Sequence, residues 1–178
     1  TALKNQRYIQ ADETTLKVLD KDKKSETHLG YLWVYHSVLS KLCVFDYQKG
    51  RGTDAPRQML TGYRGALQTD GYKVYDHYCM NPEVKHLACW AHARRYFEKA
   101  LMQDQKRASY VLIEIQKLYA IERKTADLTA EERHTIRLDE SLPIINELGK
   151  WLHRERNLVL PKSLMGKAIE YCTKLWSS

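Results

Sequence analysis

The chain has 178 residues, which is enough for one compact domain or for one domain with a helical extension. Its 29 lysines and arginines outnumber its 22 aspartates and glutamates, so the formal charge is +7. Nucleic acid is the first candidate partner for such a basic surface, although a basic protein without a polyanionic partner has the same composition. The four cysteines are scattered and form no CxxC pair, which argues against a zinc ribbon and a disulfide framework. No apolar run approaches the roughly 20 residues of a membrane span, which argues against a membrane protein.

Three strands are predicted at the start of the chain. Residues 7–19 and 29–36 are rich in β-branched and aromatic types, and the polar link between them (DKDKKSET) predicts a β-hairpin. Residues 42–47 (LCVFDY) make a third strand. Three neighbouring antiparallel strands are the simplest arrangement.

The pattern then changes. Gly50-Arg51-Gly52 interrupts the strands, and a short helix is predicted at about 54–61, with Pro56 in its first turn. Residues 66–69 (ALQT) and 84–89 (VKHLAC) have the length of buried strands.

From Trp90 onward the chain is predicted to be helical. Apolar residues recur there at helical spacing. Thr129 and Glu132 form a capping box for a helix beginning near Ala130, and Pro143 should kink or divide that helix. A last helix fits residues 163–176. The order of elements predicts an α/β (α+β) core followed by an all-helical region. Because the chain opens on Thr1 without methionine and stops directly after a helical pattern, we expect it to be a segment of a longer protein.

Two aspartates occupy positions that suggest chemistry. Asp12 lies inside a strand pattern, on the face opposite Ile9 and Ala11, and Asp70 ends the fourth strand, just before Gly71. If the first and fourth strands are adjacent, the two carboxylates could bind Mg²⁺ or Mn²⁺. Each aspartate alone also fits a structural explanation, Asp12 as a solvated strand residue and Asp70 as a turn former.

The strongest signal is a set of motifs in a fixed order. The chain resembles the DDE transposase domain of the IS66-like insertion-sequence family in residues 11–14 (ADET), 30–35 (GYLWVY), 69–72 (TDGY), 89–97 (CWAHARRYF) and 118–122 (LYAIE). This resemblance implies a ribonuclease-H-like core with a mixed five-stranded sheet over residues 1–100. Residues 101–178 would be an all-helical insertion that ends before the third acidic residue.

The same resemblance implies a chemistry. Asp12 and Asp70 would be the first two catalytic acids and would bind Mg²⁺ (or Mn²⁺) for phosphodiester cleavage and strand transfer. The partners would be DNA, both mobile-element ends and target, and further copies of the chain in an active homo-oligomer. The protein would work in the bacterial cytoplasm, with the nucleoid, and without a membrane.

The third acid is where the chain departs from the family pattern. That glutamate is expected beyond the helical insertion, in a motif with paired asparagines followed by Glu-Arg, and no such motif occurs here. Glu98 and Glu122 are the available substitutes, although acids at helical spacing are usually solvated. An isolated chain with two carboxylates should bind metal weakly and should not cleave DNA by itself.

Several residues after the fifth strand are candidates for DNA contacts. Cys89 and His92 form a Cys-x-x-His unit without further zinc ligands, so Cys89 is expected in the core, and His92 either orients a phosphate or serves a structural role. Arg94 and Arg95 could neutralise phosphates, or could simply face solvent. The four cysteines are expected to be buried thiols.

Three functions remain open from the sequence. The first is a transposase catalytic domain, and the second is a non-catalytic nucleic-acid-binding or assembly module, including a degenerate remnant without its third carboxylate. The third is a ribonuclease-H-like nuclease unrelated to transposition.

Three aromatic residues of the second strand, Tyr31, Trp33 and Tyr35, could stack on nucleic-acid bases, but a place in the hydrophobic core is favoured for them.

Overall fold

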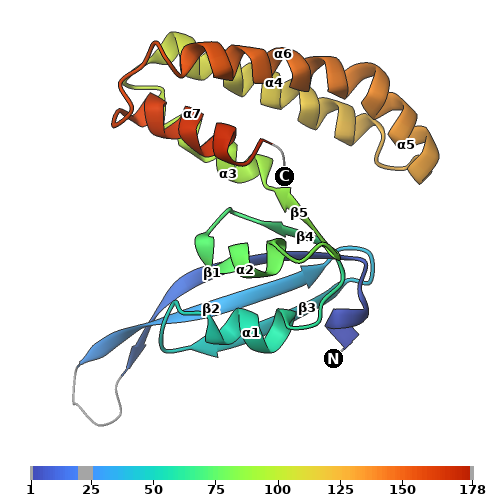
Figure 1. Ribbon diagram of the computed structural model, residues 1–178, viewed down its shortest axis with the longest axis vertical. Coiled ribbons are helices and arrows are strands. Elements are labelled where there is room, and N and C mark those ends of the chain that lie inside the picture. The colour runs from blue at the N-terminus through green and yellow to red at the C-terminus, as the bar shows by residue number, and fades with distance from the viewer. Residues whose placement is uncertain (1, 20–25, 177–178) are drawn as a thin grey trace. The chain divides into compact units, whose positions relative to one another are not determined.

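The computed structural model describes residues 2–19 and 26–176 (Figure 1). Two compact units make up this part of the chain, one ending at Cys89 and the other beginning at Trp90. The boundary predicted at residue 100, between a ribonuclease-H-like core and an all-helical insertion, stays a prediction. Most of the polar link predicted between the first two strands falls on residues 20–25, outside the described residues.

A mixed five-stranded sheet forms the first unit. Its spatial order is β3-β2-β1-β4-β5, where β1, β2 and β3 are antiparallel neighbours and β4 and β5 run parallel to β1. This is the ribonuclease-H-like sheet that the sequence predicts, and its parallel half requires the crossover connections that carry the helices. The strands are β1 (Tyr8–Leu19), β2 (Thr27–Ser37), β3 (Leu42–Gln48), β4 (Gly65–Thr69) and β5 (Val84–Ala88).

The register of β1 decides which of its side chains face the core. Ile9 and Ala11 are buried, whereas Asp12, opposite Val34 of β2, is exposed. Glu13 returns to the core face, opposite Trp33. The expectation that Asp12 lies opposite the apolar face is therefore confirmed.

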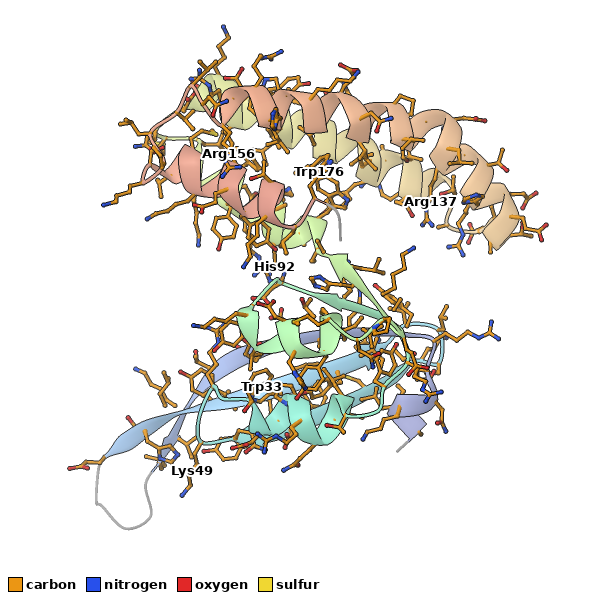
Figure 2. All side chains as sticks on the ribbon, in the orientation of Figure 1. Trp33, Lys49, His92, Arg137, Arg156 and Trp176 are labelled. Carbon is orange, nitrogen blue, oxygen red and sulfur yellow. The ribbon has the colours of Figure 1, made fainter. Side chains whose placement is uncertain are left out.

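Short helices of the first unit complete its core. Figure 1 shows α1 (Asp54–Leu60) and α2 (Asp76–Cys79) on one face of the sheet. Trp33, labelled in Figure 2, and Tyr35 are 0% exposed, so both are core residues as favoured. The sequence did not predict α2 or the two 3-10 turns, η1 (Ala2–Asn5) and η2 (Lys73–Tyr75). Tyr75 of η2 is held by edge-to-face contact with Trp33, which local sequence cannot reveal.

The second unit is helical, as predicted. A core of alanine, leucine and other apolar side chains, with Phe97 fully buried, joins its helices. The capping box of Thr129 and Glu132 is present, and Ser163 caps the last helix. Pro143 lies in the first turn of a new helix after a π-helical segment, so it divides the helical run. The elements are α3 (Trp90–Ala100), α4 (Gln105–Lys124), α5 (Ala130–Ile136), η3 (Arg137–Ser141), α6 (Leu142–Glu155) and α7 (Leu164–Lys174).

The cysteines depart from the expectation that all four are buried. Cys172 is buried, Cys79 and Cys89 are partly buried, and Cys43 is exposed. Cys43 lies on β3, the edge strand, where alternate side chains point to a face that the described elements leave open. Within the described residues, none of the helices combines the length and the apolar character of a membrane span.

Candidate metal centre and nucleic-acid interface

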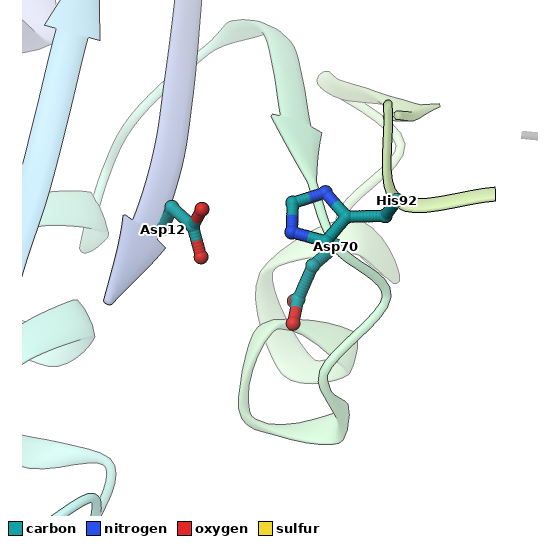
Figure 3. Close-up of side chains that lie close together, drawn as sticks. All are labelled: Asp12, Asp70 and His92. Carbon is teal, nitrogen blue, oxygen red and sulfur yellow. The ribbon is translucent and has the colours of Figure 1, made fainter. Parts of the chain in front are cut away.

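Asp12 and Asp70 come together at neighbouring strands. β1 and β4 are parallel partners from Tyr8↔Ala66 to Gln10↔Gln68, and the same register continued by two residues places Asp12, inside β1, beside Asp70, which directly follows β4. One carboxylate oxygen of Asp12 lies within 4.8 Å of one of Asp70. Figure 3 shows Asp12 on β1 and Asp70 on the loop that follows β4. The adjacency on which the sequence argument depended is thus present.

A backbone amide orients each of these carboxylates. The N–H of Glu13 donates to Oδ1 of Asp12 at 2.9 Å, and the N–H of Tyr72 donates to Oδ1 of Asp70 at 2.8 Å. Gly71 between Asp70 and Tyr72 has a φ of 78°, which favours glycine and allows the chain to turn there. Asp70 is therefore a turn former as well as a member of the pair, and the two explanations of this residue coexist.

The end of β4 is supported from inside the unit. Thr69 is 1% exposed, and its hydroxyl is hydrogen-bonded to Nε2 of His86 on β5 at 3.0 Å. The same hydroxyl accepts the N–H of Gly71 at 3.1 Å. Burial lowers the pKa of His86. A neutral His86 therefore helps to fix the turn that carries Asp70.

A further acidic residue lies behind the pair. The Glu13 side chain is 2% exposed, and its Oε1 accepts a hydrogen bond from Nε of Arg51 at 2.7 Å and another from Nη2. The hydroxyl of Tyr75 donates to Oε2 at 3.2 Å. Burial raises the pKa of Glu13, while Arg51 opposes that rise. Sequence reasoning missed this group, although the alternation of β1 places Glu13 beside Ile9 and Ala11.

The expected DNA-contacting residues lie on α3, in the second unit. His92 is partly buried in the first turn of α3, and its part in the site stays a prediction. Arg95 is exposed, and Arg94 is exposed and paired with Glu98 one turn later at 2.7 Å. Such exposed pairs are weak, so both guanidinium groups remain available to an anion.

Both substitute glutamates are already ion-paired. Glu98 pairs with Arg94, and Glu122 accepts hydrogen bonds from Nε and Nη2 of Arg137 at 2.7 and 2.6 Å. The Arg137 contact lowers the pKa of Glu122. In the described part of the chain, no glutamate belongs to the group that contains Asp12 and Asp70.

The donor atoms of the pair fit a hard divalent cation. Carboxylate oxygens are the ligands that Mg²⁺ and Mn²⁺ prefer, and one oxygen of each side chain lies within 4.8 Å of one of the other. Two carboxylates leave most of an octahedral shell to water or substrate, which is typical of magnesium sites that act on phosphates.

Comparisons with known proteins agree with the motif evidence. A family model described as "Transposase IS66 family" matches residues 1–178. Two uncharacterised proteins of Sinorhizobium fredii are similar: y4hP is 29% identical over 94% of this chain, and y4qI is 27% identical over 95%. The chain covers 34% of the length of each, so it spans about a third of these relatives.

A solved structure with partial similarity is the simian T-cell lymphotropic virus intasome in complex with the PP2A regulatory subunit B56 gamma. It matches with 16% identity and a TM-score of 0.35, over 75% of this chain and 47% of that one.

Proposed function

The chain belongs to the IS66 family of transposases, and we propose that it supplies two of the carboxylates with which the full-length protein cleaves DNA and joins it at mobile-element ends. Asp12 and Asp70 are these two residues. The observation that supports the proposal is their convergence within 4.8 Å on adjacent parallel strands, Asp12 inside β1 and Asp70 directly after β4. In open α/β sheets, ligands bind outside the carboxyl ends of the strands.

Both aspartates would hold Mg²⁺ or Mn²⁺. When bound, such an ion makes an attacking hydroxyl more acidic and offsets the negative charge that develops on phosphate oxygens. The chain's own contribution is orientation. A backbone N–H donates to Oδ1 of each aspartate, and this contact fixes the direction in which the carboxylate points.

DNA contacts are assigned to His92, Arg94 and Arg95. His92 would orient a phosphate, and the two arginines would neutralise backbone charge without reading sequence.

A second candidate function is a non-catalytic module for nucleic-acid binding or assembly. It is favoured because no glutamate among the described residues belongs to the group that contains Asp12 and Asp70. In either case the protein would act on DNA in the bacterial cytoplasm, as part of a homo-oligomer.

Strand transfer by the full-length protein tests the first proposal. We expect Asp12→Asn and Asp70→Asn to abolish Mg²⁺-dependent joining of labelled element-end DNA while gel-shift binding persists, because the change removes ligand charge and keeps side-chain volume. Asp54→Asn, at an exposed carboxylate of α1, is the matched control and should keep activity. Undiminished joining by Asp70→Asn would refute the assignment.

The fragment provides a separate test. Residues 1–178 alone should not cleave DNA, since the pair lacks a third carboxylate in the described part of the chain. Robust Mg²⁺-dependent cleavage that is lost in Glu98→Gln would show that Glu98 completes the site. DNA binding by a full-length wild-type protein that never joins ends would instead support the non-catalytic module.

A further inference from the structure

Arg51 contacts two residues, Glu13 and Tyr72, that in turn contact Asp12 and Asp70, and it lies outside the sequence motifs quoted above. It belongs to the Gly50-Arg51-Gly52 loop between β3 and α1, and its side chain is 43% exposed. Within the first unit it contacts one residue that follows Asp12 and one that follows Asp70. These two contacts suggest a function for the loop.

The first contact is with Glu13. Two nitrogens of the Arg51 guanidinium donate to the same carboxylate oxygen of Glu13, whose side chain is almost completely buried. Glu13 in turn donates its backbone N–H to Oδ1 of Asp12. A residue anchored by its side chain and donating through its backbone fixes the direction of the neighbouring carboxylate.

The second contact is with Tyr72. The guanidinium carbon of Arg51 lies 3.9 Å from the centroid of the Tyr72 ring, and the Tyr72 hydroxyl donates to the Arg51 backbone oxygen at 3.1 Å. Tyr72 donates its backbone N–H to Oδ1 of Asp70. The arrangement repeats that of Glu13 and Asp12, with Arg51 holding the side chain of the residue whose amide orients the aspartate.

We propose that Arg51 is a positioning residue that sets the separation and orientation of the Asp12 and Asp70 carboxylates through Glu13 and Tyr72. This inference rests on the proposed function, since it concerns the same pair. Arginine suits the role because its planar group can donate two hydrogen bonds in the plane and stack on an aromatic ring with its face. Lysine keeps the charge but provides neither the fork nor the flat face.

Metal binding by the 178-residue chain is the first arm of the test. Mn²⁺ affinity is measured by the electron paramagnetic resonance signal of free Mn²⁺, in wild type, Arg51→Lys, Arg51→Met and Arg64→Met. Loss of a residue that orients metal ligands typically weakens binding by about 10- to 100-fold, and we expect that loss in both Arg51 variants. Arg64 pairs with Glu83 on the surface of the same unit, so Arg64→Met should match wild type.

Hydrogen exchange in the metal-free chain is the second arm. The Tyr72 and Glu13 amides should exchange faster in Arg51→Lys than in Arg64→Met, because the side chains of the two residues that carry these amides are less well held. Tyr72→Phe, which removes only the hydroxyl contact with the loop, should give an intermediate change. This arm needs no metal and guards against a variant that simply fails to fold.

The two arms separate the proposals. If the wild-type chain binds no Mn²⁺ but the Tyr72 amide exchanges faster in Arg51→Lys, the positioning role of Arg51 is kept and the metal site is refuted. Wild-type binding that is lost in Asp70→Asn but unchanged in both Arg51 variants, together with unchanged amide exchange, would overturn the role of Arg51.

Discussion

Replacing Thr69 with valine tests how the turn that carries Asp70 is stabilised. Valine keeps the shape of the buried side chain but removes its hydrogen bonds with His86 and Gly71. Each bond contributes about 0.5–1.5 kcal/mol net, and a buried polar group left without a partner costs about 1–3 kcal/mol. We therefore expect the free energy of unfolding to fall by about 2–4 kcal/mol.

Urea unfolding followed by circular dichroism measures this loss. Thr27→Val, at an exposed position of β2, is the matched control and should change stability by less than about 0.5 kcal/mol. The Mn²⁺ affinity of Thr69→Val should also fall, because Asp70 directly follows the altered residue. A Thr69→Val protein as stable as the control would show that the hydroxyl does not support the turn.

Three other changes probe the packing, the pH dependence and the caps. Gly166→Ala should destabilise the second unit by about 1–3 kcal/mol or more despite alanine's better helix propensity, because the added Cβ would lie 2.2 Å from the Leu160 backbone oxygen; a gain in thermal midpoint would contradict this. Burial lowers the pKa of His86 from 6.5, so as the pH falls the unfolded chain binds this proton before the folded chain does. The contribution of His86 to the free energy of unfolding should therefore be complete above pH 6.5 and should decline below it by at most about 1.4 kcal/mol per pH unit. Urea midpoints measured against pH should show a smaller decline in His86→Gln. Thr129→Ala removes a capping box and should cost about 1 kcal/mol, measured by urea unfolding; an unchanged midpoint would mean that the cap does not contribute to stability.

The sequence predicted the strands and the positions of Asp12 and Asp70 on them because those signals are local. Alternation along residues 7–19 placed Asp12 on the face opposite the core, and the Asp-Gly step marked the end of β4. The family motifs added the identity of the sheet, which strand propensity alone does not determine. The capping box at Thr129 was equally visible, since both of its partners lie within four residues.

The contacts of Arg51 could not be predicted in the same way. Its partner Glu13 lies 38 residues earlier and Tyr72 lies 21 residues later, so their meeting depends on the tertiary fold. The short helices at residues 73–79 were missed for a similar reason, because Tyr75 is held by Trp33 of β2 and not by a local helix signal. Only the alternation at Glu13 offered a clue, as a carboxylate on the apolar face.

The neighbouring carboxylates of β1 link the site to the correctness of folding. Asp12 and Glu13 are consecutive and face opposite sides of the sheet, one toward solvent and one toward the core. A slip of one residue in the pairing of β1 would exchange them, burying Asp12 and expelling Glu13 together with Ile9 and Ala11. Chains with that error would lose their apolar core as well as their acidic pair.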